Sequence, residues 1–178
     1  MNAEHLAALY RSKARAELDA ADALVAGSAA VRWRGDPLAD VVIVAGSPSE
    51  EDRAAGAAVT GATGDAAAKA LDALGVAREA VLTLVSRPVE GTTLAALTRR
   101  LELAVEAVDP RLVIAIDAAA AEDLAAAYST GVLEQGRAVR ARGRMLGYVG
   151  DLGASLDDVE LKTAVWKAFK SVAARSPL

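Results

Sequence analysis

Three short apolar runs limit the folds open to this chain more than any other feature of its sequence. They lie at 41–45 (VVIVA), 81–85 (VLTLV) and 112–116 (LVIAI), and none shows the strict alternation of apolar and polar residues that marks a half-exposed strand. Unbroken β-branched and aliphatic runs of this length are typical of parallel strands covered on both faces. We therefore expect a buried sheet with a layer of helices on each side.

Stretches with helical periodicity separate these runs. The many alanines favour helix there, because alanine loses no side-chain rotamer freedom. The alternation of strands and helices predicts right-handed crossovers and a parallel sheet. A fourth strand or a short hairpin is expected within 137–149. The helices are expected at 3–26, 65–74, 92–108, 118–127 and 157–173.

Together these elements predict an α/β protein, a three-layer α/β/α sandwich with a central, mostly parallel four-stranded sheet. The chain has 178 residues, which is enough for one well-buried core. We expect a single domain over residues 31–178. An N-terminal helical segment, residues 1–30, is expected to pack on it.

Composition excludes several kinds of site. The chain has no cysteine, so it cannot hold a disulfide, an iron–sulfur cluster or a thiolate-bound zinc ion. Its one histidine, His5, lies near the N-terminus, where it is badly placed to activate a nucleophilic serine. No run of 18 apolar residues occurs. We expect no cofactor, no metal, no membrane partner and a cytoplasmic location.

Several short motifs follow one another in a distinctive order. They are GSP at 46–48, ED at 51–52, VTGATG at 59–64, GVAREAV at 75–81, RP at 87–88, PRLVIAIDAAA at 110–120 and KTAVWKAFK at 162–170. In this order they resemble the family 4 and family 5 uracil-DNA glycosylases. The resemblance covers residues 33–173 and implies the same three-layer fold. It also implies a ligand pocket formed by Gly46, Ser47, Pro48, Val59 and Leu82.

The resemblance fails where that family carries out its chemistry. The segment 148–155, where the family places a histidine, contains none. The region of the family's catalytic acid reads Ser47-Pro48-Ser49, and Val59 stands in place of the base-stacking aromatic. The base-reading asparagine falls at Leu82 or Thr83, and one cluster cysteine falls at Ser86. Base excision requires stabilisation of charge on both sugar and base, each contribution being worth about 3–4 kcal/mol. We therefore expect no glycosylase activity.

Two classes of function remain open. The first is a catalytically inactive uracil-DNA glycosylase-like protein that acts as a binding or scaffold module, with a DNA replication or repair protein as partner. The second is a divergent DNA glycosylase or nucleobase-binding enzyme with relocated catalytic acids, for which Asp52, Asp151 and Glu51 are the candidates. A filled pocket with an apolar patch elsewhere favours the first class. An open pocket with a convergent carboxylate favours the second.

Three arginines alternate near the C-terminal part of the chain: Arg140, Arg142 and Arg144. On a strand this spacing puts all three side chains on one face. Such a stripe suits weak binding to nucleic-acid phosphates, since neutralising phosphates releases counterions. The alternative is an exposed edge strand that charge protects from aggregation.

Other polar segments have a structural interpretation. The glycine-rich passage 46–64 lacks the spacing of a nucleotide-binding loop and is interpreted as a structural loop. The acidic groups at 50–52 and 157–160 suit the first turns of helices, where carboxylates oppose the dipole. Trp166 and Phe169, three residues apart on the last helix, are expected to pack in the core.

Overall fold

The three apolar runs form the middle of the sheet, as the sequence predicts. A computed structural model describes residues 3–176 and places β2 (Val41–Ala45), β3 (Val81–Val85) and β4 (Leu112–Ala115) side by side in parallel, with β2 in the centre. A fourth parallel strand, β6 (Arg144–Tyr148), pairs with β4. Every residue of β2 and β4 is buried, as expected for strands covered on both faces.

Two antiparallel strands extend this parallel centre at its edges. β1 (Arg34–Gly35) pairs with β3, and β5 (Ala138–Ala141) pairs with β6. The sheet is therefore mixed, with six strands in the order β1-β3-β2-β4-β6-β5. The predicted count of four strands is wrong because β1 is too short to leave a pattern, and because the segment 137–149 forms the hairpin that was the alternative to a single fourth strand, with its turn at Arg142-Gly143.

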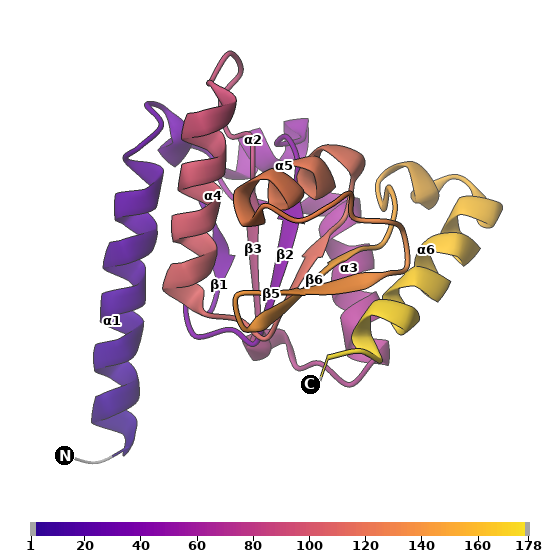
Figure 1. Cartoon of the computed structure of the whole chain (residues 1–178), viewed down its shortest axis with the longest axis horizontal. Coiled ribbons are helices and arrows are strands. Elements are labelled where there is room, and N and C mark those ends of the chain that lie inside the picture. Colours follow the sequence, from indigo (N-terminus) through magenta and orange to yellow (C-terminus); the bar gives the residue numbers. More distant parts are fainter. Residues whose placement is uncertain (1–2, 177–178) are drawn as a thin grey trace.

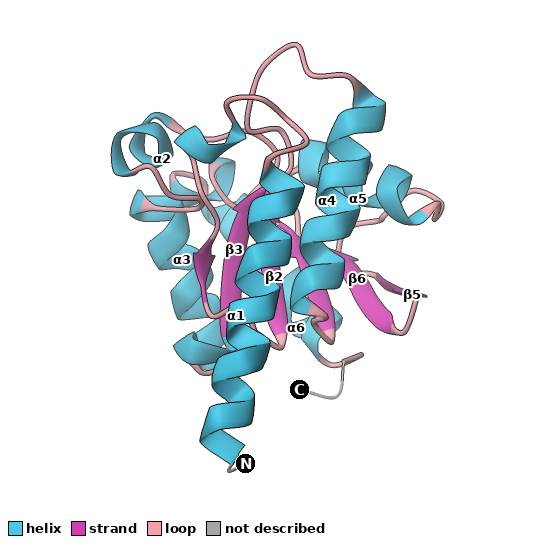
Figure 2. Ribbon diagram, turned by 90° about the vertical axis from the view of Figure 1, so that its left-hand side faces the viewer, coloured by secondary structure: helices cyan, strands magenta, loops and turns pink. Residues whose placement is uncertain are grey.

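Helices cover both faces of the sheet (Figures 1 and 2). On one face lie α1 (Ala3–Asp22), α4 (Leu94–Val108) and α5 (Ala118–Tyr128); on the other lie α3 (Gly61–Ala73) and α6 (Val159–Ala173). The short helix α2 (Glu50–Ala55) follows β2 at the carboxyl end of the sheet. Three 3-10 turns complete the chain, at Ser28–Ala30, Arg78–Ala80 and Ala154–Leu156.

The strand side chains divide into two core layers. Val42 and Val44 of β2 pack with Leu82 and Leu84 of β3 on the α1/α4/α5 side. Alternate positions, Val41, Ile43 and Ala45 among them, pack on the α3/α6 side. Because successive side chains of a strand point to opposite faces, one continuous apolar run supplies both layers.

The N-terminal helix is held by its second half. Ala14, Leu18 and Ala21 are buried, whereas Leu6, Leu9 and Tyr10 are exposed. At the end of α1, Asp22 accepts hydrogen bonds from Nε and Nη2 of the buried Arg100 of α4, at 3.0 and 2.7 Å. Arg100 also donates to the Val85 carbonyl at 2.7 Å, which ties α1 and α4 to the end of β3. In the described range 3–176, no helix combines the length and apolar character needed to cross a membrane.

One glycine controls how closely α6 approaches the sheet. A Cβ added to Gly147 of β6 would lie 2.4 Å from Cγ1 of Val172 on α6. Gly147→Ala should therefore lower the free energy of unfolding, measured with urea, by about 1–3 kcal/mol because it overpacks this layer. Gly131→Ala is the matched control, since a Cβ there meets nothing within 4 Å. Equal stability of the two variants would contradict this packing.

Candidate functional site

The carboxyl edge of the parallel strands is the place where a sheet of this topology binds ligands. The neighbours of β2 are β3 on one side and β4 on the other, so the strand order reverses at β2. Open α/β sheets bind their ligands in the crevice outside such a switch point. The residues that meet there are those that follow β2, β3, β4 and β6.

Main-chain and side-chain hydrogen bonds join the loops at this edge, and a groove of about 560 Å³ remains open between α5 and Tyr148. The Gly46 N–H donates to Oδ2 of Asp117 at 2.7 Å, and the Ala120 N–H donates to Oδ1 at 2.8 Å. Asp117 thus caps α5 and uses both carboxylate oxygens within the protein. A Cβ on Gly46 would lie 2.6 Å from Cβ of Ala119, so the loop and α5 are in close contact. The Leu152 N–H donates to the Ile116 carbonyl at 2.9 Å and closes the neighbouring gap between β4 and β6.

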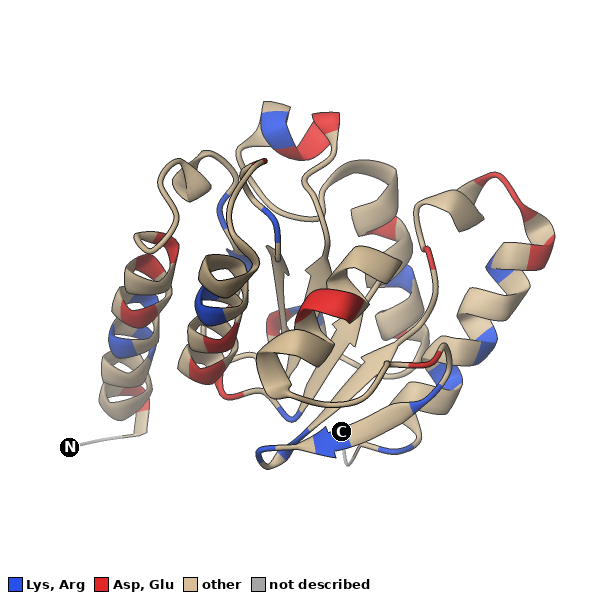
Figure 3. Cartoon of the chain, turned by 45° about the horizontal axis from the view of Figure 1, so that its top comes forward, with Lys and Arg blue, Asp and Glu red and all other residues tan. Residues whose placement is uncertain are grey.

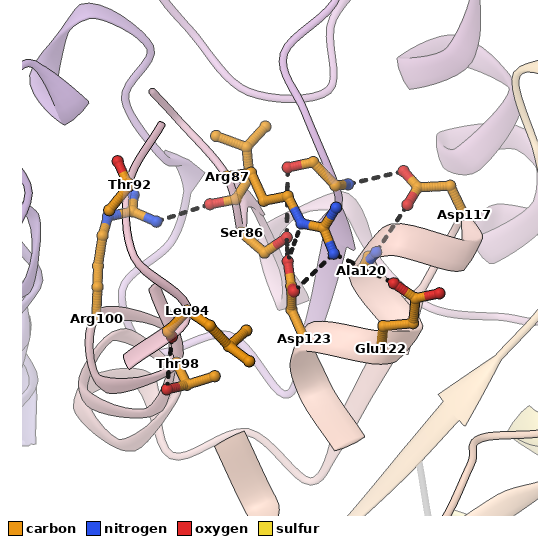
Figure 4. Close-up of polar contacts among 12 residues, drawn as sticks. Ser86, Arg87, Thr92, Leu94, Thr98, Arg100, Asp117, Ala120, Glu122 and Asp123 are labelled. Atoms are coloured by element: carbon orange, nitrogen blue, oxygen red, sulfur yellow. Dashed lines mark hydrogen bonds and ion pairs between the residues drawn. The ribbon is translucent and has the colours of Figure 1, made fainter. Parts of the chain in front are cut away.

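A buried carboxylate joins β3 to α5 (Figure 4). Asp123 is 1% exposed and accepts Ser86 Oγ at 2.6 Å and Arg87 Nε at 2.8 Å on one oxygen, and Arg87 Nη2 at 2.9 Å on the other. The exposed Glu122 accepts a longer bond from the same arginine, at 3.3 Å. Its hydrogen bond to Asp123 raises the pKa of Arg87 and keeps the guanidinium charged. Arg87 is therefore committed to Asp123 and Glu122.

Asp52, one of the candidate acids, holds the loop between α2 and α3. It is 3% exposed and accepts the Ser49 N–H at 3.0 Å, the Thr60 N–H at 2.6 Å and Thr60 Oγ1 at 2.7 Å. Ser49 Oγ in turn accepts the Asp52 N–H, which completes a capping box for α2. Burial raises the pKa of Asp52, but the hydrogen bonds from Thr60 and Ser49 outweigh it, and the pKa falls below its usual value. These bonds make Asp52 a structural anion.

Asp151 and Tyr148 form the exposed part of the edge. Asp151 is exposed and accepts the Ala154 N–H at 2.8 Å. Tyr148, half-buried at the end of β6, has a pKa raised by burial and then by the nearby charges of Asp151 and Asp117. The phenol therefore stays protonated at neutral pH. A site with two carboxylates and a neutral phenol repels phosphate.

The pocket residues implied by the resemblance are only partly brought together. Gly46, Ser47 and Pro48 lie at the carboxyl edge, where Ser47 is exposed. Val59 and Leu82, 2% and 0% exposed, belong to the two core layers on opposite faces of the sheet. They cannot form the floor of one pocket, because the sheet lies between them. Val59 has φ of 53°, and its carbonyl accepts Arg34 Nη2 at 2.6 Å.

The three alternating arginines do not share a face. Arg140 is exposed on β5, Arg142 lies in the turn between β5 and β6, and Arg144 is 4% exposed. Arg144 donates to Glu106 at 2.8 and 3.0 Å and to Tyr128 Oη at 3.0 Å. Arg142 pairs with Glu102 and lies 5.2 Å from the Tyr128 ring centroid. The expected stripe is therefore wrong as geometry, since it assumed one uninterrupted strand.

Burial of Tyr128 accompanies this arginine pair. Desolvation is the main cause that raises the pKa of the phenol far above its ordinary value, so its hydroxyl remains protonated and donates to Glu106 at 3.0 Å. Two of the three arginines thus neutralise carboxylates of α4. Only Arg140 remains available to a phosphate.

A wide apolar groove lies between α3 and α6, and it reaches the carboxyl edge at Leu152. Its volume is about 630 Å³. Phe169 at its base is buried in the core, as predicted, whereas Trp166 is half-buried and lines the groove. The sequence feature that corresponds to this groove is a row of alanines on α3. The lining residues are Ala62, Asp65, Ala66, Lys69, Ala70, Ala73, Leu152, Ser155, Leu156, Lys162, Val165, Trp166 and Phe169.

The acidic residues at 50–52 and 157–160 occupy helix starts, as their pattern predicts: Ser49 caps α2 and Asp158 caps α6. Within residues 3–176 no group of three or more His, Asp or Glu is placed to hold a metal ion.

No protein-family model matches this chain, and no curated protein matches it in sequence.

The two carboxylates that share Arg87 should differ in their contribution to stability. Asp123→Ala leaves Ser86 and Arg87 without their buried acceptor and should lower the free energy of unfolding by about 2–3 kcal/mol, less than for a fully buried pair because Arg87 is partly exposed. Glu122→Ala removes an exposed partner of the same arginine and should change the free energy of unfolding by less than about 1 kcal/mol. Urea unfolding of both variants measures the difference. A larger effect at Glu122 would refute the assignment.

The lowered pKa of Asp52 predicts a pH-dependent contribution to stability. Because the carboxyl has a lower pKa in the folded than in the unfolded state, its stabilisation is present at neutral pH and is lost as pH falls through the folded pKa, below about pH 4. Asp52→Asn should lower the free energy of unfolding by about 2 kcal/mol near neutral pH. This difference in stability between the variant and the wild type should shrink near pH 3.

Urea unfolding at the two pH values measures this change, with Asp72→Asn as the control. Asp72 is exposed on α3, and its side chain makes no hydrogen bond or ion pair with the residues described. A deficit at Asp52 that is equally large at both pH values would show that its charge contributes nothing.

Proposed function

We propose that this chain is a non-catalytic binding module built on a uracil-DNA glycosylase-like α/β scaffold, and that it works with a protein of DNA replication or repair in the cytoplasm. One observation carries the proposal. Polar groups at the carboxyl edge bond to one another, whereas the groove between α3 and α6 is wide and mainly apolar. Surfaces of this kind favour an interaction site over a reaction site.

The groups that remain at the carboxyl edge do not suit base excision. A flipped base needs a stacking surface and a polar reader of its edge. Val59 and Leu82, at the aligned positions, are buried on opposite faces of the sheet. Asp52 is fully engaged with Ser49 and Thr60, which argues against its use as a relocated catalytic acid.

Direct binding of DNA through the alternating arginines has less support than a protein partner. Arg144 is buried against Glu106, and Arg142 pairs with Glu102, so neither is offered to a phosphate. Arg140 is the one member that is exposed and forms no ion pair with the residues described. A single arginine gives a shallow salt dependence of binding, because that slope follows the number of phosphates neutralised.

Incubation with uracil-containing oligonucleotides tests this function. The full chain, with single- and double-stranded substrates at two salt concentrations, should form no abasic sites above the buffer blank, because the segment 148–155 has no histidine to stabilise the departing base. An active glycosylase on the same substrates is the positive control. Alkaline cleavage detects abasic sites, and fluorescence anisotropy follows binding. Excision that is lost in Asp151→Asn would overturn the proposal and identify a relocated acid.

A further inference from the structure

The groove between α3 and α6 owes its width to small side chains. Ala62, Ala66, Ala70 and Ala73 of α3 line it, with spacings of four, four and three residues. Residues at such spacings lie along one side of a helix. At 1.5 Å per residue, the row extends for about 16 Å, or three helical turns. A longer side chain at any of these positions would occupy space that is now open.

The opposite wall and the floor are larger and apolar. Val165, Trp166 and Phe169 of α6 face the alanine row, and Leu152 and Leu156 line the groove beside the start of α6. The Trp166 indole is half-buried, and Lys170 lies 5.5 Å from its ring centroid. A flat aromatic surface opposite a row of alanines provides the apolar contact that an amphipathic helix seeks in a groove.

The charged residues that line the groove are two lysines, Lys69 and Lys162, and one carboxylate, Asp65, in a protein of net charge −4. Four of the five lysines in the chain lie on these two helices: Lys69 on α3 and Lys162, Lys167 and Lys170 on α6. Figure 3 shows the basic positions along α6. Lys69 and Lys162 line the groove, and neither forms an ion pair with the residues described. Lys162 donates to the Leu156 carbonyl at 3.1 Å.

We infer that this groove binds an amphipathic helix of a partner protein, with the apolar face of that helix against Trp166 and the alanine row and with carboxylates opposite Lys69 and Lys162. The inference rests on the proposed binding function and specifies the chemistry of the partner, an amphipathic helix with acidic residues. One acidic residue, Asp65, also lines the groove at the first turn of α3. It disfavours a carboxylate at that end and so gives the bound helix a direction.

The length and charge of the groove select this occupant. A small ligand needs a site that buries most of its surface, whereas this groove runs along three turns of α3. Two helices already form its walls, and a third helix packs into such a groove at the usual interaxial distance of about 8–10 Å. Unpaired lysines at the rim favour an acidic partner, because complementary charge raises the association rate and excludes wrong partners.

A displayed peptide library tests the inference on the full chain. Each peptide is an 18-residue helix with a fixed leucine face, and six flanking positions encode Glu or Lys in equal proportion. Selection on the immobilised wild-type chain should enrich Glu over Lys by roughly 2–5-fold at each position that contacts a rim lysine. The enrichment should decline at high salt, because exposed charges are screened.

Charge reversal supplies the decisive comparison. Lys69→Glu combined with Lys162→Glu should invert the preference, so that Lys-flanked peptides are enriched. Lys13→Glu combined with Lys167→Glu changes the net charge equally at lysines outside the groove lining and should leave the preference for Glu unchanged. Equal behaviour of the two double variants would overturn the assignment of the charged partner to this groove.

Steric closure gives an independent readout. Ala73→Trp introduces a large side chain at an exposed end of the groove and should remove all enrichment, whereas Ala164→Trp, on the exposed side of α6, should not. Circular dichroism and urea unfolding verify that both variants fold. If Ala73→Trp leaves enrichment intact, the groove is not the binding site. If it instead dissolves a dimer seen by sedimentation, the occupant is a second copy and the inference is wrong.

These outcomes separate the inference from the function on which it rests. Uracil excision by the wild type would overturn the non-catalytic function, whatever the peptides do. Absence of any enriched peptide, with no excision, would overturn the helix-binding groove and leave the non-catalytic assignment standing. Salt-sensitive oligonucleotide binding that Lys69→Glu combined with Lys162→Glu abolishes would assign the rim to nucleic acid and would also refute the peptide partner.

Discussion

The burial of β2 on both faces is the constraint on which the rest of the structure depends. A strand with no exposed residue must pair its backbone with neighbours on both sides, since unpaired polar groups in a core are costly. β3 and β4 provide those neighbours. Each face then needs a helical layer, which α1, α4 and α5 supply on one side and α3 and α6 on the other. The alternation along the chain follows from this requirement.

Buried ion pairs join the layers where apolar packing alone leaves polar ends. Arg100 joins α1 and α4 to β3, Asp123 joins α5 to β3, and Arg144 joins β6 to α4. A buried charge is tolerated only with partners, so each pair restricts the position of its elements even where its net contribution to stability is small. The pairs of Arg100 and Asp123 lie at the carboxyl end of β3, whereas Arg144 begins β6 at the opposite edge of the sheet. Structural contacts therefore engage Ser86, Arg87 and Asp123 near the switch point, whereas Ser47 and Asp151 stay exposed.

The extent to which the sequence predicts this fold differs between its elements. The runs at 41–45, 81–85 and 112–116 were sufficient for the central strands, because burial on both faces leaves an unbroken pattern. The edge strand β1 was not predicted, because it has only two residues, whereas a hairpin within 137–149 was one of the two expected alternatives and is formed by β5 and β6. Helix starts at Ser49 and Asp158 were recognisable from their clustered carboxylates.

Site predictions were harder, because they depend on which face of the sheet each side chain occupies. The aligned positions Val59 and Leu82 look equivalent in sequence, yet they pack in different layers. The spacing of Arg140, Arg142 and Arg144 predicted one face only as long as the strand continued, and the turn at Arg142 ends it. Periodicity gives the face of a residue within one element. It does not give the pairing of one element with another.

The alanine content of the chain connects its fold to its surface. Short side chains let helices approach closely: Ala104 of α4 and Ala120 and Ala121 of α5 lie within the core layer on the α1 side. On α3 the same residue type has the opposite effect, because Ala66, Ala70 and Ala73 face α6 across a gap that they are too short to fill. Gly147 allows α6 to sit close to the sheet at Val172, while the alanine row leaves the α3 side open. A composition that favours helix formation thus fills the core layer beneath α4 and α5 and leaves a groove between α3 and α6 on the other side of the sheet.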